Sequence, residues 1–103
     1  CEAIVAALPE KVYISFDIDG LDPSLCPNTG TPVPGGLEFE AAMYLLDQVA
    51  ASGRTIIGAD LVEVAPPPLP EHVSEEQLLR DEWDASVGAR VLYRMIGAMM
   101  HTA

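Results

Sequence analysis

Two aspartates near the end of an apolar stretch are the clearest candidates for a functional site. Asp17 and Asp19 are separated by one residue, and side chains at that spacing in a β-strand project from the same face. Neighbouring carboxylates repel one another, and burial raises their pKa values. A divalent cation removes both penalties, and carboxylate oxygens suit Mg²⁺, Mn²⁺ and Ca²⁺. The pair therefore predicts a metal site, while the simpler alternative is a solvent-exposed acidic strand end.

The stretch that carries the two aspartates has the alternating pattern of a β-strand. It covers residues 11–19, is rich in β-branched and aromatic residues, and lies between Pro9 and Gly20. Its two faces are Val12, Ile14, Phe16 and Ile18 on the apolar side, and Tyr13, Ser15, Asp17 and Asp19 on the other. Because open α/β sheets bind ligands beyond the carboxyl ends of their strands, the aspartates lie where a ligand site is expected.

A long loop, a helix and a second strand follow the aspartates. Residues 20–36 hold four glycines and four prolines without periodicity, and loops of this length in compact domains are functional or disordered. Helical spacing of apolar residues predicts a helix over residues 37–52, which Gly53 ends, and residues 54–64 have the pattern of a strand. A strand, a helix and a strand with short connections predict a parallel βαβ unit.

The remaining sequence predicts helices, but too few elements for a complete domain. Ser74 begins a stretch with capping-box spacing to Gln77, which predicts the start of a helix. Residues 83–100 predict a final helix that is apolar over most of its surface, so we expect it to pack against the sheet or another subunit. Two parallel strands with two or three helices cannot cover both faces of a sheet. We therefore expect the chain to be part of a larger α/β domain.

Composition narrows the class of ligand and partner. The 103 residues include 16 acidic and 5 basic side chains, which gives a net charge of −11. This balance excludes a binder of nucleic acid or of an anionic membrane and favours a small cationic ligand. No apolar run approaches the length of a membrane-spanning helix. Two cysteines, an acidic N-terminal stretch and the absence of an initiator Met predict a cytoplasmic protein whose chain continues before residue 1.

Two families that carry an aspartate pair match this stretch incompletely. Calcium loops have Glu at their twelfth position, where this sequence has Asn28, and no predicted helix precedes Asp17. The segment also resembles the hhhhDxDGT motif of haloacid-dehalogenase phosphatases. In such a Mg²⁺ phosphatase, Asp17 would be the nucleophile and Asp19 the acid/base, but Leu21 replaces the phosphate-binding Thr. The phosphatase is kept as an alternative.

A third resemblance covers two long motifs. The stretches SFDIDGLDP at residues 15–23 and PNTGTPVPGG at residues 27–36 resemble the signature of the ureohydrolases, the family of arginase, agmatinase and formimidoylglutamase. The segment GADLVEVAP at residues 58–66 resembles the family's next strand. The resemblance implies a three-layer α/β/α arginase-like fold with a parallel sheet, of which residues 1–103 form the C-terminal portion of a single domain.

The activity that the resemblance implies is binuclear manganese hydrolysis of a C–N bond in a guanidino compound. In such an enzyme, two Mn²⁺ ions would lower the pKa of water and orient the resulting hydroxide toward the guanidinium carbon. Carried over to this sequence, Asp17 bridges both ions, Asp19 binds one, and Glu63 pairs with the cationic end of the substrate. Thr31 lines the substrate pocket through its hydroxyl, and we assign Asp60 a structural role.

The family's remaining catalytic groups are expected before residue 1. They are a His, an Asp-x-His-x-Asp cluster and a proton-shuttle His, whereas this chain has only His72 and His101, neither in such a motif. We therefore expect no catalytic residue within the chain, weak metal binding and no turnover by these residues alone. The alternatives are a formimidoylglutamase-like hydrolase of a formimino compound and an inactive ureohydrolase-like subunit.

Two arginines on the predicted final helix are candidates for ion pairs or for a subunit interface. Arg90 and Arg94 lie four positions apart, near Asp81, Glu82 and Asp84. We interpret them as members of surface ion pairs, each of which contributes little to stability. The alternative is an interface between subunits, since the resemblance implies a homo-trimer or homo-hexamer.

Overall fold

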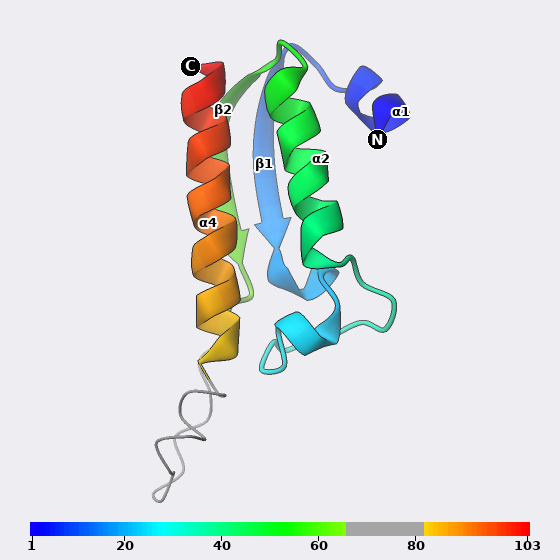
Figure 1. The fold of residues 1–103 in the computed structure, drawn as a ribbon, viewed down its shortest axis with the longest axis vertical. Helices are drawn as coiled ribbons and strands as arrows, with labels where there is room; N and C mark the ends of the chain where they lie inside the picture. The colour runs from blue at the N-terminus through cyan, green and yellow to red at the C-terminus, as the bar shows by residue number, and fades with distance from the viewer. Residues whose placement is uncertain (66–81) are drawn as a thin grey trace, which may run out of the picture.

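The chain folds as a short parallel sheet with helices packed along it (Figure 1). The computed structural model describes residues 1–65 and 82–103. Its elements are, in chain order, α1 (Glu2–Ala6), β1 (Lys11–Asp17), the single-turn 3₁₀ helices η1 (Ile18–Gly20) and η2 (Pro23–Leu25), α2 (Phe39–Ala51), β2 (Thr55–Val62) and α4 (Trp83–Thr102). The capping motif at residues 74–77 and His72 lie outside the described residues.

β1 and β2 pair in parallel, which confirms the predicted βαβ unit. Lys11 lies opposite Thr55 and Asp17 lies opposite Val62, with a register shift after Val12. Because the strands run in the same direction, both end at the lower edge of the sheet in Figure 1, beside the long loop. The functional residues predicted at the two strand ends therefore share one edge.

β1 ends at Asp17, two residues earlier than the alternation predicts. Asp17 caps the turn η1, since its side chain accepts a hydrogen bond from the backbone N–H of Asp19. This local bond is typical of Asp before a turn and competes with the strand conformation. The expectation that Asp19 projects from the strand is therefore wrong, and the turn determines how the two aspartates meet.

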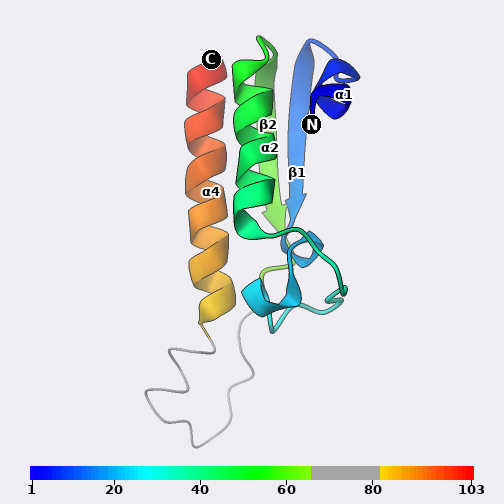
Figure 2. The ribbon, with the colours of Figure 1, turned by 45° about the vertical axis from the view of Figure 1, so that its right-hand side comes forward.

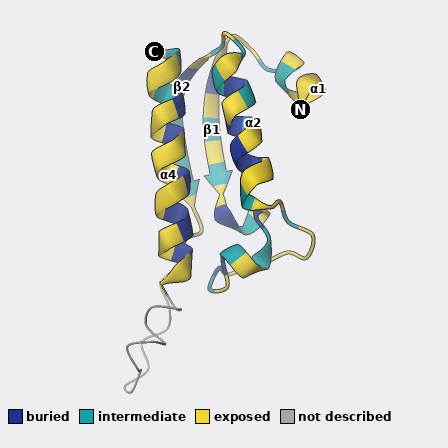
Figure 3. Ribbon diagram, viewed as in Figure 1, coloured by how far each residue is buried: buried dark blue, intermediate teal, exposed yellow. Residues whose placement is uncertain are grey.

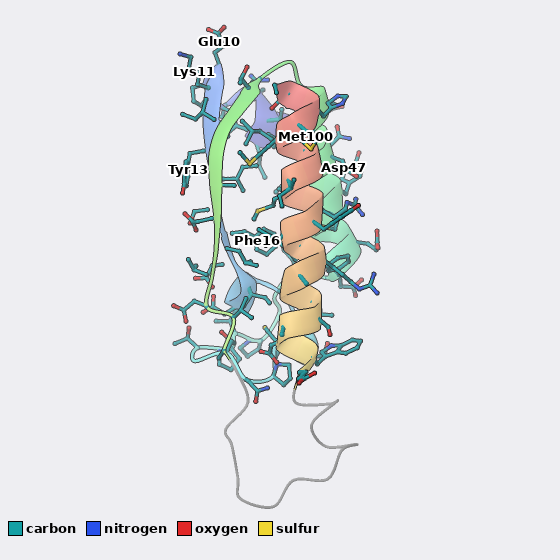
Figure 4. All side chains as sticks on the ribbon, turned by 90° about the vertical axis from the view of Figure 1, so that its left-hand side faces the viewer. Glu10, Lys11, Tyr13, Phe16, Asp47 and Met100 are labelled. Carbon is teal, nitrogen blue, oxygen red and sulfur yellow. The ribbon has the colours of Figure 1, made fainter. Side chains whose placement is uncertain are left out.

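The two faces of β1 differ as its alternation predicts. Val12 is buried, Ile14 and Phe16 are half-buried, and Tyr13 and Ser15 are exposed. Figure 4 shows Phe16 directed toward the helices and Tyr13 directed away from them. Fully burying a Val, Ile or Phe side chain contributes about 1.5–3 kcal/mol, so the apolar face determines which side of the strand the helices cover.

α2 and α4 lie side by side against the apolar face of the sheet (Figure 2). Their buried residues recur at helical spacing and line the sides of the helices that meet the core (Figure 3). The apolar ones are Ala42, Met43, Leu46 and Val49 in α2, and Val87, Val91, Met95 and Ala98 in α4. α2 begins at Phe39 rather than at Leu37, because the backbone of Leu37 bonds to the chain at residues 20–22. Both predicted helices are otherwise confirmed.

Apolar residues remain exposed on the strands and on the outer side of α4. Tyr13 and Ile57 are 57% and 60% exposed, and Tyr93 on α4 is 80% exposed. The described residues thus supply the parallel sheet and one helical layer of the expected three-layer α/β/α fold. None of the described helices is long and apolar enough to cross a membrane.

Candidate functional site

The predicted site residues belong to segments that meet at the carboxyl end of the sheet. Asp17 ends β1, Asp19 lies in η1, and Glu63 is the first residue after β2. Thr31 belongs to the long loop between η2 and α2. Parallel strands place their carboxyl ends together, and Asp17 pairs with Val62, the residue before Glu63. Positions that are far apart in the sequence therefore become neighbours.

Asp17 and Asp19 contact one another through the turn. The backbone N–H of Asp19 donates to Oδ1 of Asp17 over 3.1 Å. The pKa of Asp17 is raised above its usual range, first because the carboxyl is partly withdrawn from water. The neighbouring Asp19 side chain and the negative charges of Asp19 and Glu63 raise this pKa further, while the backbone N–H of Asp19 acts in the opposite direction. Carboxylates held this close favour a proton or a cation between them.

Thr31 contacts the second aspartate directly. Its Oγ1 donates a hydrogen bond to Oδ2 of Asp19, 12 residues earlier in the chain. The sequence predicts this hydroxyl in a substrate pocket, whereas the structure places it on the carboxylate that we expect to bind metal. A hydrogen bond of this kind fixes the orientation of a carboxylate, as partners of metal ligands do in known sites.

Glu63 has a strained backbone at the end of β2. Its φ is 69°, a left-handed conformation that costs a residue with a side chain about 1–3 kcal/mol. The hydroxyl of Thr29, which is buried, donates to the Glu63 carbonyl over 3.0 Å and so supports this conformation. A methyl group added at Gly30 would lie 4.0 Å from Oε2 of Glu63, which places the carboxylate beside the loop. Sequence reasoning missed Thr29, because its partner follows 34 residues later.

A buried carboxylate on α4 anchors the same loop. Asp84 is fully buried; its two oxygens accept the backbone N–H of Asn28 at 3.0 and 3.3 Å, and one also accepts the side-chain amide at 3.2 Å. The interpretation of Asp84 as a surface partner of Arg90 or Arg94 is therefore wrong. Arg94 instead pairs with Asp47 of α2 over 3.0 Å. Asn28 and Asp84 are 56 residues apart, so no local pattern indicates their contact.

The two ends of the long loop are tied together beside the aspartates. The N–H of Asp22 donates to the Leu37 carbonyl at 2.8 Å, and the N–H of Leu37 donates to the Gly20 carbonyl at 2.9 Å. A methyl group on Gly36 would lie 2.3 Å from the carbonyl oxygen of Leu21, so only glycine fits at this close approach. The loop is thus closed at its base as well as held at Asn28, Thr29 and Thr31.

Asp60 accepts two hydrogen bonds on the exposed face of the sheet. The hydroxyls of Tyr13 and Ser15 each donate to it over 2.9 Å. The Tyr13 ring lies over Gly58, where an added methyl group would be 2.8 Å away. The hydrogen bond to Asp60 raises the pKa of Tyr13 above its usual range. These contacts join β1 to β2, in agreement with the structural role predicted for Asp60.

The oxygen atoms of the aspartate pair suit a hard divalent cation. Carboxylates are ligands that Mn²⁺ and Mg²⁺ prefer in proteins. Within residues 1–65 and 82–103, no three His, Cys, Asp or Glu side chains are grouped so that they could hold a metal ion. His101 is exposed near the C-terminal end of α4. The aspartate pair therefore fits two ligands of such an ion, and the residues that the structure describes group no third one with them.

An apolar groove follows β1 up to Asp17. It encloses about 370 Å³ and is lined by residues of α1, β1 and α2, among them Val12, Ile14 and Leu46. Asp17 and Gly20 contribute to its lining as well. The groove therefore connects the apolar side of β1 with the turn that carries the candidate site.

Comparison with known proteins assigns the chain to a family. The arginase family model matches residues 1–97. This chain belongs to the arginase family. Over 65 residues it is 46% identical both to hepatic arginase of Aquarana catesbeiana and to N(1)-aminopropylagmatine ureohydrolase of Thermus thermophilus. The matched segment is 63% of this chain and 20% and 22% of those two proteins.

A solved arginase-family structure has the same fold. The crystal structure of agmatine ureohydrolase of Thermoplasma volcanium superimposes with a TM-score of 0.68 and 27% identity, over 97% of this chain and 30% of that one. The family and the arginase-like α/β fold predicted from residues 15–36 and 58–66 are therefore confirmed, and the phosphatase alternative is set aside. The chain spans about a fifth of the length of the curated relatives it matches.

Proposed function

We propose that the protein carrying this chain is a manganese-dependent hydrolase of a C–N bond in a guanidino compound. The observation that carries the proposal is the contact among Asp17, Asp19 and Thr31 at the carboxyl end of the parallel sheet. Membership of the arginase family and relatives named arginase and ureohydrolase support the substrate class. Because this chain covers a fifth of such relatives, the proposal concerns the whole protein.

The aspartate pair is the part of the metal site that this chain supplies. We propose that Asp17 and Asp19 would hold the two ions through their carboxylate oxygens. When bound, two Mn²⁺ ions lower the pKa of water and stabilise the charge that develops as it attacks. Thr31 holds Asp19 in one orientation, so the ligand is prearranged before the cation arrives.

Glu63 is assigned to the cationic end of the substrate. A carboxylate accepts two parallel N–H donors from a planar guanidinium, which fixes orientation as well as charge. Glu63 is exposed at the end of β2, and the loop holds its backbone through Thr29. The net charge of −11 adds a general attraction for a cation.

The remaining ligands and the proton-shuttle His are assigned to residues outside this chain. Ions such as Mg²⁺ and Mn²⁺ require several ligands each, and two aspartates supply too few for two ions. We therefore propose that residues 1–103 act with an N-terminal part of the same domain. By themselves, they are expected to bind Mn²⁺ weakly and to release no urea.

Assembly of the enzyme as a homo-trimer or homo-hexamer is part of the proposal. The exposed side of α4 supports it, since Leu92, Tyr93, Ile96 and Met100 are between 45% and 80% exposed. Contiguous exposed apolar residues on a folded protein mark interaction surfaces. The outer side of α4 is therefore the surface that we assign to contacts between subunits.

The decisive experiment measures urea release by the full-length protein. Metal is removed with a chelator, and guanidino compounds that end in a carboxylate, an amine or both are offered before and after Mn²⁺ is restored. We expect urea release only with Mn²⁺, and a loss of more than about 100-fold in Asp17→Asn and Asp19→Asn. Asp47→Asn, which removes only the surface pair with Arg94, should stay within about twofold of the parent.

Other outcomes separate the alternatives. Formamide release from a formimino compound, without urea release from any guanidino compound, assigns a formimidoylglutamase-like activity instead. A folded, Mn²⁺-loaded protein that releases neither product contradicts the proposal and favours the inactive-subunit alternative.

A further inference from the structure

The buried carboxyl group of Asp84 contacts neither the proposed metal ligands nor Glu63 directly. It lies in the first turn of α4 with none of its surface exposed. Burying an ionised carboxylate is costly unless hydrogen bonds compensate, and a helix N-terminus stabilises it only partly. Here the hydrogen bonds come from Asn28, through its backbone N–H and its side-chain amide. The buried carboxyl group of Asp84 is therefore hydrogen-bonded to the long loop.

Asn28 begins a four-residue segment, residues 28–31, that contacts three elements; we call it the loop bridge. Asn28 is held by α4, while Thr29 donates to the carbonyl of Glu63 at the end of β2. Thr31 donates to Asp19 after β1. Thr29 directly follows Asn28 and Thr31 lies two residues further on, so a displacement of Asn28 would shift the backbone that carries both threonines. The loop bridge thus connects the start of α4 to both strand ends.

Glu63 depends on the loop bridge for its backbone conformation. A φ of 69° is unfavourable for Glu and persists only where neighbouring groups hold it. The hydrogen bond from Thr29 is such a group, and its loss lets the peptide relax toward an ordinary conformation. A relaxed backbone at this position would turn the Glu63 side chain away from the direction it has here.

We infer that Asp84 is a positioning residue that sets the orientation of both Glu63 and Asp19 through Asn28. The inference rests on the proposed function, in which those two residues contact substrate and metal. Asp84 is hydrogen-bonded to the loop bridge and is assigned no contact with either ligand. Its removal therefore weakens binding of substrate and of Mn²⁺ together, while every ligand remains in the protein.

The test compares Asp84→Ala and Asp84→Asn with Val87→Ala in the full-length protein. Val87 is buried in the same helix and, having no polar side-chain atom, contributes packing alone. We expect Asp84→Ala to raise the Mn²⁺ dissociation constant and the KM by about 10–100-fold. Asp84→Asn keeps the shape and one acceptor oxygen, so it should recover most of this loss. Val87→Ala should lower thermal stability and leave both constants within about twofold.

Each measurement is made well below the unfolding temperature of the variant concerned. The Mn²⁺ constant is obtained from the electron paramagnetic resonance signal of free Mn²⁺, which needs no turnover. If the unsubstituted full-length protein binds Mn²⁺ but releases no urea, the proposed function is contradicted. The Mn²⁺ dissociation constants of the variants would still decide the inference about Asp84. Equal shifts in Asp84→Ala and Val87→Ala, or no shift in Asp84→Ala, overturn the inference.

Discussion

Asp19 and Glu63 are each held by a threonine of the loop bridge rather than by apolar packing. Thr31 bonds the Asp19 side chain, and Thr29 bonds the Glu63 backbone. Hydrogen bonds contribute about 0.5–1.5 kcal/mol each to folding, so such contacts define geometry more than stability. We therefore expect substitutions of Thr29 and Thr31 to change the free energy of ligand binding by more than they change the free energy of unfolding.

Replacing Glu63 should separate stability from activity. Glu63→Gly removes the penalty of the left-handed backbone, so we expect the free energy of unfolding to rise by about 1 kcal/mol. Urea denaturation of the full-length protein measures this change. Glu63→Ala keeps the strained backbone and should not gain stability. Under the proposed function, both variants should also lose hydrolysis of guanidino compounds. Equal stability of the two variants would contradict the prediction.

The phenol of Tyr13 should titrate above the usual range. Its proton is held by the bond to Asp60, so the pKa of Tyr13 is higher in the folded than in the unfolded state. This contribution to stability is complete below the unfolded pKa of about 10 and is lost as pH rises through the folded pKa. Tyrosinate absorbance should show a late component that Tyr13→Phe removes and Tyr44→Phe keeps. Loss of that component in Tyr44→Phe instead would contradict the assignment.

At the scale of elements, the site is a meeting point of two strand ends, a loop and the start of a helix. Asp17 is the last residue of β1, Glu63 directly follows β2, and the loop supplies the threonines. The close approach of Gly36 to Leu21 closes the base of that loop. The base of the loop is therefore held by close backbone contacts, which leave no room for a side chain at position 36.

Gly36→Ala should be strongly destabilising. The added methyl group would lie 2.3 Å from the carbonyl oxygen of Leu21, and backbone on both sides has to move. We expect a loss of about 2 kcal/mol or more in the free energy of unfolding, measured by denaturant titration. Gly97→Ala is the matched control, since nothing lies within 4 Å and the helix gains about 0.5–1 kcal/mol. Similar effects in the two variants would contradict this account.

Local sequence patterns predict the elements of this fold well and their long-range contacts poorly. Hydrophobic periodicity places the ends of β1, α2, β2 and α4 within two residues, because it reports which side of each element is buried. It does not reveal the turn at Asp17, which a side-chain hydrogen bond creates. The Asn28 contact of Asp84 is equally hidden, since an acid in the first turn of a helix is common for electrostatic reasons alone. The strained φ of Glu63 has no sequence signature.

At the scale of the whole molecule, the described residues leave apolar surface uncovered. Parallel sheets are almost always covered on both faces, whereas here α2 and α4 cover one face. The apolar groove along β1 and the exposed Ile57 add to this surface. Such surface is stable in a larger domain and unfavourable in an isolated chain.

The isolated 103-residue chain should therefore self-associate. We expect sedimentation velocity to show larger species as concentration rises, because exposed strands and apolar patches pair with one another. Ile57→Lys should reduce this association. Ala51→Lys adds the same charge at an exposed position of α2 and should reduce it less. A monomer at every concentration would contradict the expectation.

One stretch of the long loop, residues 32–35, takes part in none of the contacts that hold the loop at Asn28, Thr29, Thr31 and Gly36. Residues 32–35 are all exposed, while Thr31 before them and Gly36 after them are fixed. Insertions there would extend into solvent without displacing either anchor, since the cost of lengthening a surface loop grows slowly. Longer versions of this stretch would begin beside Thr31, where, under the proposed function, they would discriminate between the tails of different guanidino compounds and leave Asp19 and Glu63 untouched.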